Sequence, residues 1–240
     1  GERLARLYSA EVAFLDRELE RLLDGLSERG VLEDSLVIVT GDHGETFWEH
    51  GDFWNHGLGV YQTTVSVPLL MRLPAGRSAG REVDAPVSTL DVMPTICGLL
   101  GVETPPVVEG VDLSAALEGE RPPDRILVCE ATQPIGAVEI EGKWRNIGKA
   151  KAVRQGRWKY IITPYLGNRE ELYDLEADPD EQVNLLGSPS LASLEKGAEL
   201  RGALDAWAAR LDPLPSEFEP AQTDAVRARL KALGYSGEDD

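Results

Sequence analysis

All the histidines of this chain lie in one short stretch, where carboxylates are interleaved with them. The three are His43, His50 and His56. The acidic residues of the stretch are Asp42, Glu45, Glu49 and Asp52. A carboxylate offers a hard anionic oxygen and a neutral imidazole offers a directional nitrogen, a combination that suits a divalent cation. Because adjacent residues on a tight loop can both reach one ion, we predict that Asp42 and His43 are metal ligands.

A short β-branched run, residues 36–40, comes directly before this pair. Such a run after a helix is typical of a fully buried parallel strand. Open α/β sheets bind ligands where their parallel strands end, and Gly41 and Gly44 allow the backbone to turn sharply beside the pair. An isolated Asp-His pair would more simply cap a turn and face solvent. The clustering and the position at a strand end favour a metal site.

The residues around this stretch predict an α/β arrangement. Apolar residues recur every three or four positions over residues 4–26, as in an amphipathic helix, and Gly30 supplies a stop signal. The elements that we expect next are a polar loop over 41–57, a strand over 67–72 and a helix from Ser88 or Asp91 to Gly101.

The pattern changes after residue 122, where we place a boundary. Three β-rich runs, 126–128, 151–154 and 157–162, predict antiparallel strands, the last two joined by a tight turn at Gln155-Gly156. We also expect a helix over 191–211, a Pro-rich linker over 213–220 and a short helix over 224–233. The predicted division is a core at 1–122, an antiparallel subdomain at 123–187 and a helical tail at 188–240.

Composition excludes several classes of protein. The formal net charge of -18 opposes binding to nucleic acid, and no apolar run approaches the ~20 residues that span a bilayer. Cys97 and Cys129 have neither metal-ligand spacing nor the pattern of a disulfide framework. The chain opens with Gly1 inside an expected helix, so we expect a truncated or processed start, and localisation stays open.

Several short motifs occur in an order that resembles one family. They are Gly-Asp-His-Gly-Glu at 41–45, Glu-His-Gly at 49–51, His-Gly at 56–57 and Val-Pro-Leu-Leu at 67–70. Further matching stretches lie at 11–16, 88–95, 152–160, 171–175, 178–179 and 184–185. Together they resemble the sulfatases of the alkaline-phosphatase superfamily over nearly the whole chain.

The resemblance implies a fold and a set of functional residues. The fold would be the C-terminal portion of an alkaline-phosphatase-like α/β core with a small C-terminal antiparallel β subdomain. Asp42 and His43 would bind one divalent ion, for which we expect Ca2+, with Mn2+ or Zn2+ as alternatives. His56 occupies the approximate place where the family has a His or Lys that touches the sulfate group or the leaving oxygen. His50 is a weaker candidate for substrate binding, and the substrate would be a small-molecule or glycan sulfate ester.

The chain also departs from the family pattern. The family nucleophile is a Cys or Ser in a Cys/Ser-x-Pro/Ala-x-Arg element that is converted to formylglycine. Here Cys97 precedes Gly-Leu-Leu and Cys129 precedes Glu-Ala-Thr, so neither fits. The family's early pair of Asp ligands is missing as well. We therefore expect the nucleophile and these ligands in an N-terminal region outside this sequence.

The sequence thus predicts a metal-dependent sulfuric ester hydrolase, represented by its C-terminal half. Two alternatives stay open. One is a phosphodiester or phosphonate monoester hydrolase of the same superfamily, in which an Asp-His pair also occurs. The other is a non-catalytic remnant with a structural or partner role, which the missing nucleophile would explain.

Overall fold

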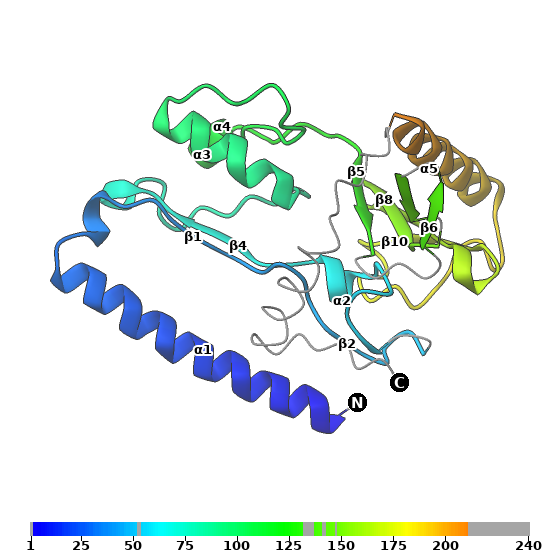
Figure 1. Ribbon diagram of the computed structural model, residues 1–240, viewed down its shortest axis with the longest axis horizontal. Helices are drawn as coiled ribbons and strands as arrows, with labels where there is room; N and C mark the ends of the chain where they lie inside the picture. The colour runs from blue at the N-terminus through cyan, green and yellow to red at the C-terminus, as the bar shows by residue number, and fades with distance from the viewer. Residues whose placement is uncertain (1, 52–53, 132–136, 141–142, 147, 211–240) are drawn as a thin grey trace.

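The computed structural model describes residues 2–51, 54–131, 137–140, 143–146 and 148–210. The Pro-rich linker predicted over 213–220 and the helix predicted over 224–233 lie outside this part of the chain. In the described part, a long helix lies alongside two paired strands in one half of the molecule (Figure 1). A four-stranded sheet with its own helix lies in the other half.

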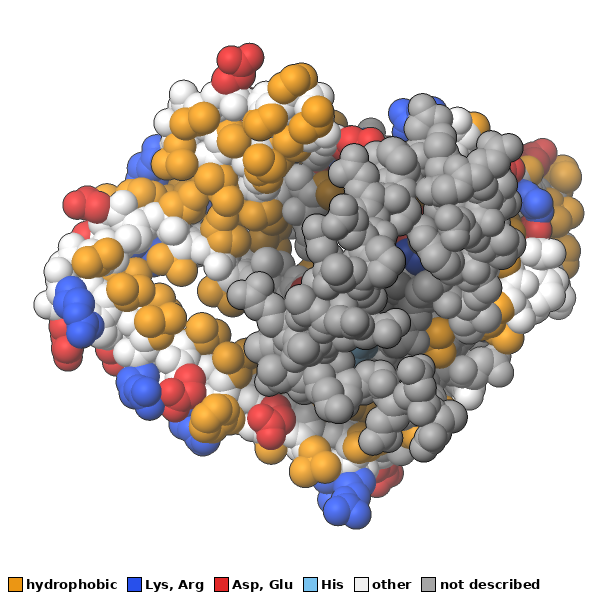
Figure 2. Space-filling view, in the orientation of Figure 1, with side chains coloured by type: hydrophobic (Ala, Val, Ile, Leu, Met, Phe, Trp, Pro, Cys, Tyr) orange, Lys and Arg blue, Asp and Glu red, His pale blue; other side chains and the backbone are white. Residues whose placement is uncertain are grey.

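The predicted first helix is confirmed as α1, Glu2–Glu28. Gly30 follows at φ 69°, a left-handed conformation that ends a helix readily when no Cβ is present. None of the α1 side chains is buried, and its apolar face, including Leu7, Val12 and Leu15, is about half exposed. Figure 2 shows hydrophobic side chains along this helix. Within the described residues no helix is long and apolar enough to cross a membrane.

The predicted strand before the Asp-His pair exists as β1, Val37–Thr40, but its surroundings differ from the prediction. It pairs with β4, Leu69–Arg72, in antiparallel orientation, and its side chains are only half-buried. A parallel partner needs a long crossover, usually helical, to return the chain to its starting end. In the described residues between these strands, the elements are the hairpin of β2, Thr46–Phe47, and β3, Trp54–Asn55, and the short helix α2, Gln62–Val65. The prediction of a parallel, fully buried strand was therefore wrong, because β1 pairs with β4 in antiparallel orientation and is only half-buried.

Short helices cover one side of the β1–β4 pair (Figure 1). The 3-10 helix Thr89–Asp91 begins at a capping box formed by Ser88 and Asp91 and leads into α3, Val92–Leu100, which ends at Gly101 in the left-handed region, as predicted. α4, Ser114–Glu118, packs against α3. Single-turn 3-10 helices occupy Leu32–Asp34, Pro74–Gly76, Thr89–Asp91 and Pro164–Leu166.

The three predicted antiparallel strands are confirmed, and a further strand over residues 169–174, which was not predicted, joins them in one four-stranded sheet. Its members are β5, Leu127–Glu130, β8, Lys151–Gln155, β9, Trp158–Thr163, and β10, Arg169–Asp174, in the order β10-β9-β8-β5. A separate hairpin joins β6, Ala137–Ile140, to β7, Lys143–Asn146. The predicted last helix is α5, Leu191–Ala209, capped by Ser190, and it packs its buried Leu200 and Leu204 on this sheet.

The other face of this sheet packs against the segment that follows the histidine-rich loop. Val60 and Tyr61 are buried in one cluster with Ala152, Ile161 and Tyr173 of the sheet. The loop and the sheet are therefore coupled through a common core. The domain limits at residues 122 and 187 stay a prediction.

Candidate functional site

The Asp-His pair lies where β1 ends, on a backbone path that is held closely by a second segment. The Gly44 N–H donates to the carbonyl of Thr64 at 2.8 Å. A Cβ on Gly44 would lie 2.1 Å from the carbonyl oxygen of Thr63, so only glycine fits this crossing. The sequence Gly-Asp-His-Gly thus turns sharply against the helix α2.

Asp42 and His43 face each other at this turn. The His43 N–H donates to Asp42 Oδ1 at 2.9 Å, and Asp42 Oδ2 lies 3.7 Å from His43 Nε2. The backbone hydrogen bond from His43, followed by the His43 charge, lowers the pKa of the Asp42 carboxyl. The carboxylate is exposed and stays ionised, as a metal ligand requires.

The tautomer of His43 follows from its backbone neighbour. Its Nδ1 lies 2.9 Å from the carbonyl of Gly44, which can only accept a hydrogen bond. In the neutral ring Nδ1 therefore carries the proton, and Nε2 presents its lone pair on the side of Asp42. A backbone carbonyl on the other ring nitrogen is the usual support for a metal-binding imidazole.

The donor set fits part of a metal site. Asp42 Oδ2 and His43 Nε2 are one hard anionic oxygen and one directed nitrogen, close enough together to bind a single ion. Among the residues that the structure describes, no group of three or more His, Cys, Asp or Glu side chains is arranged around one point. The two residues could therefore supply two of the four or more ligands that a divalent ion takes.

His56 lies against this pair. Its ring stacks on the ring of His43 with centroids 4.0 Å apart, and its Nδ1 lies 3.1 Å from Glu45 Oε2. The carboxylate of Glu45 therefore orients the imidazole of His56. The sequence did not assign a role to Glu45, because its partner His56 lies eleven positions further along the chain. The signal that could have identified Glu45 was the presence of a glutamate two residues after the Asp-His pair.

His50 lies on a different support. Its ring stacks on Tyr61 with centroids 3.7 Å apart and an interplanar angle of 8°. Burial lowers the pKa of its imidazole, against the raising influence of Glu181, Glu171 and Glu49, so the ring stays neutral to lower pH than usual. Its Nε2 is buried and has no hydrogen-bond partner among the described residues. Its predicted role in substrate binding remains a prediction.

The remaining acidic residues of the loop divide into two cases. Glu49 accepts hydrogen bonds from the Thr46 hydroxyl at 2.7 Å and the Phe47 N–H at 2.5 Å, so it shapes the β2–β3 hairpin. Asp52 lies outside the described residues. The structure therefore brings together Asp42, His43, Glu45 and His56 as the candidate site.

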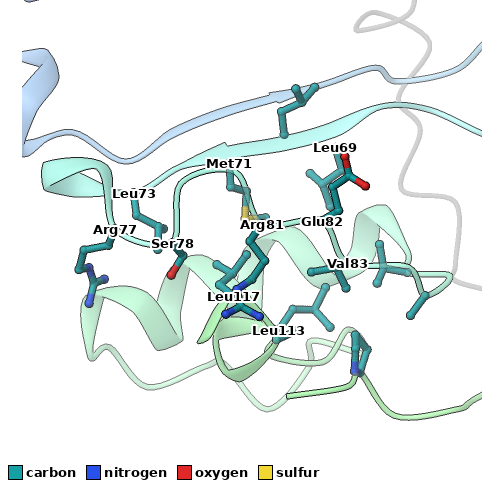
Figure 3. Close-up of a pocket in the computed structure, with 15 residues that line it drawn as sticks. Leu69, Met71, Leu73, Arg77, Ser78, Arg81, Glu82, Val83, Leu113 and Leu117 are labelled. Carbon is teal, nitrogen blue, oxygen red and sulfur yellow. The ribbon is translucent and has the colours of Figure 1, made fainter. Parts of the chain in front are cut away.

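A well-formed pocket lies elsewhere, between β4 and α4. Its cavity of about 490 Å³ is lined mainly by apolar side chains such as Met71, Val83 and Leu117, with Arg81 among them. Figure 3 shows these side chains converging from the strand, the following loop and the helix. None of the predicted site residues lines it.

Comparison with known proteins identifies relatives of the chain. Residues 2–102 match the family model described as Sulfatase. The chain is 32% identical to a choline-sulfatase of Rhizobium meliloti over 190 residues, which are 78% of this chain and 34% of the relative. It is 28% identical to a Δ4,5-hexuronate-2-O-sulfatase of Bacteroides thetaiotaomicron, with 92% of this chain and 44% of the relative covered. The chain thus spans less than half the length of these two curated relatives.

Solved structures show the same fold. One structure, of a protein in complex with its substrate D-glucosamine-2-N,6-O-disulfate, superposes with a TM-score of 0.67 at 26% identity, covering 87% of this chain and 41% of that one. A phosphonate monoester hydrolase of Agrobacterium radiobacter superposes with a TM-score of 0.65 at 28% identity, covering 84% of this chain and 40% of that one. The alkaline-phosphatase-like α/β fold with a C-terminal antiparallel sheet is thereby confirmed.

Proposed function

The chain belongs to the sulfatase family, and we propose that it forms part of a metal-dependent hydrolase of sulfate esters. The observation that carries the proposal is the grouping of Asp42, His43 and His56 at the end of β1. There the oxygen and nitrogen of the pair lie 3.7 Å apart and the His56 ring stacks on His43. This grouping lies within the segment that matches the family model.

Asp42 and His43 would hold a divalent ion, and we propose Ca2+, with Mn2+ or Zn2+ as alternatives. A bound divalent ion would withdraw charge from the sulfate oxygens and stabilise the developing oxyanion. Asp42 contributes an ionised carboxylate to this site. The Gly44 carbonyl fixes the proton of His43 on Nδ1, so that Nε2 is the atom that binds.

His56 would assist departure of the ester oxygen. An imidazole held at a fixed angle can donate a proton to an alkoxide or phenoxide as negative charge develops on it. Glu45 fixes that angle by accepting from Nδ1, and the stack on His43 fixes the ring against the metal-binding pair. The donor is therefore placed beside the site where the sulfate group would bind.

The attacking nucleophile is not supplied by the cysteines of this chain. Burial raises the pKa of the Cys129 thiol, which keeps it protonated on the sheet, and Cys97 lies on α3 without the family's sequence context. We propose that a formylglycine from outside these 240 residues provides the nucleophile. The substrate class that we propose is a small-molecule or glycan sulfate ester, in line with the substrates named for the relatives.

A second candidate is hydrolysis of phosphonate monoesters. The favouring observation is the superposition with the phosphonate monoester hydrolase at 28% identity, together with the Asp-His pair. The two functions are separated by the full-length protein's kcat/KM for phenyl sulfate and for phenyl methylphosphonate. A clear preference for the sulfate ester supports the proposal, and a preference for the phosphonate replaces it. Turnover of neither, with metal present, supports the non-catalytic remnant.

A further inference from the structure

An ion pair without access to solvent lies under the histidine-rich loop. Lys159 Nζ of β9 lies 2.6 Å from Glu181 Oε1, and the two side chains are 2% and 0% exposed. Burial lowers the pKa of Lys159, and the Glu181 carboxylate opposes that effect. A buried ion pair contributes little net stability compared with apolar packing, so its presence points to a specific structural task.

Both partners of this ion pair reach one residue, Gln62, at the start of α2. Lys159 Nζ donates to Gln62 Oε1 at 3.1 Å, and the Gln62 N–H donates to Glu181 Oε2 at 2.5 Å. The first N–H groups of a helix have no partner within it, so Glu181 satisfies one of them. The ion pair therefore attaches α2 to the C-terminal sheet.

A second buried carboxylate fixes the residue before Gln62. Glu171 of β10 accepts hydrogen bonds from the hydroxyls of Tyr61 at 2.7 Å and Tyr173 at 2.8 Å. The guanidinium of Arg169 donates to the Tyr61 hydroxyl at 2.9 Å. The Tyr61 ring, on which His50 stacks, is thus held by side chains of the sheet.

A third contact lies closer to His56. The Tyr165 hydroxyl donates to the carbonyl of Leu58 at 2.9 Å. Leu58 follows His56 by two residues, and the segment from Leu58 to Gln62 is therefore attached to the C-terminal part of the chain at both ends.

We propose that Glu181 is a positioning residue, which, with Lys159, fixes Gln62 and the adjacent Tyr61 and thereby holds His50 in place in the loop that carries the candidate site. A role of His50 in turnover rests on the proposed function, but the dependence of its position on Glu181 does not. According to this proposal, the C-terminal sheet holds the loop of the site in position and is not an independent part of the molecule.

The test uses hydrogen exchange measured by mass spectrometry on the full-length protein, without substrate. Replacing Glu181 alone would leave the Lys159 charge buried and unpaired, which can unfold the sheet. The first variant is therefore Lys159→Met combined with Glu181→Leu. The matched control is Arg201→Met combined with Glu170→Leu, because this ion pair joins α5 to β10 on the same sheet and is more exposed.

A second variant tests the attachment without touching the ion pair. Gln62→Pro removes the N–H and the side-chain amide that bind Glu181 and Lys159. Proline fits the first position of a helix, and Tyr61 before it already has the extended conformation that proline requires (φ -72°, ψ 163°).

The expected result is the same for both test variants. Backbone amides of residues 56–66 exchange about tenfold faster or more, a factor typical of losing a hydrogen bond to a charged group. The imidazole C2 hydrogen of His50 also exchanges faster, while amides of residues 158–163 and all sites in the control stay near wild type. Unchanged exchange of His50 and of residues 56–66 in both test variants overturns the proposal. Equal acceleration in the control, or in residues 158–163, overturns it too, since the effect would then be general loosening of the sheet.

Discussion

At the scale of single residues, the candidate site was partly visible in the sequence. Asp42 and His43 are adjacent in the sequence, so the sequence alone predicted that they act together. In the structure, Asp42 Oδ2 and His43 Nε2 lie 3.7 Å apart. The partners Glu45 and His56 lie eleven residues apart, and their contact depends on how the β2–β3 hairpin folds back. Such a contact cannot be predicted from the residues that are neighbours in the sequence.

The first prediction concerns the metal. Asp42→Ala and His43→Ala in the full-length protein should each weaken binding of the divalent ion by at least roughly 100-fold, because even outer-shell partners of metal ligands contribute up to that factor. The fold should be retained, because Asp42 and His43 are both exposed, and His43 contacts its sequence neighbours and the His56 ring of the same loop. Elemental analysis after gel filtration, with circular dichroism for the fold, measures this. Wild-type metal content in both variants would remove the pair from the site.

The second prediction concerns His56. Its substitution by alanine should slow alkyl sulfate esters by about a hundredfold or more, within the usual range for loss of a general acid. Activated nitrophenyl esters should be slowed much less, because less charge builds on a good leaving group. The dependence of rate on leaving-group pKa measures the difference, and Glu45→Gln should show the same trend more weakly. Parallel slopes for wild type and variant would exclude His56 from leaving-group assistance.

The third prediction concerns His50 and pH. Because burial lowers its folded-state pKa below the ordinary value of 6.5, the unfolded state binds more protons than the folded state just below that pH. Stability should therefore fall as the pH drops through about 6.5 and level off below the folded-state pKa. His50→Phe keeps a ring on Tyr61 without a titrating group, so the difference in unfolding free energy between the proteins should vary with pH in this window. A difference independent of pH from 8 to 5 would contradict the buried, neutral His50.

At the scale of elements, the positions of helices and strands along the chain were predicted better than the pairing and burial of the strands. The 3.6-residue spacing of α1, the helix cap at Ser88 and the β8–β9 hairpin at Gly156 are local patterns, and all three are confirmed. The pairing and burial of β1 are not local, because an apolar run describes a strand but not its neighbours. The Lys159–Glu181 pair was missed for the same reason, although a lysine within the apolar run of β9 was a signal.

The fourth prediction belongs to the backbone crossing at the site. Gly44→Ala places a Cβ 2.1 Å from the Thr63 carbonyl oxygen, so the loop must separate from α2 and lose its hydrogen bond to Thr64. We expect a loss of about 1–3 kcal/mol of stability together with loss of metal binding. Gly41→Ala is the matched control, since its nearest contact, at 3.4 Å to Val67, is ordinary packing. Thermal unfolding and metal titration of both variants measure this, and equal behaviour of the two would show that the crossing does not constrain the site.

At the scale of the whole molecule, the loop that carries the candidate site is coupled to the C-terminal sheet through a common core. The order of motifs along the chain was enough to predict the family and the α/β fold. The coupling between segment 58–62 and the C-terminal sheet could not be predicted, because it joins residues about 100 positions apart. The chain spans about a third of the choline-sulfatase that it matches, and the proposed metal site has two candidate ligands, Asp42 and His43, among the described residues. We therefore predict that the 240-residue chain by itself does not hydrolyse aryl sulfate or aryl phosphate esters.

The central claim is that Asp42 and His43 belong to the metal site of a sulfate ester hydrolase. Its most direct test is the release of inorganic sulfate from an aryl sulfate by the full-length protein, with and without a chelator, for wild type and Asp42→Ala. We predict release by the wild type that the chelator abolishes and divalent metal restores, and loss of at least roughly 100-fold in the variant. Sulfate release that neither the chelator nor Asp42→Ala reduces would contradict the account.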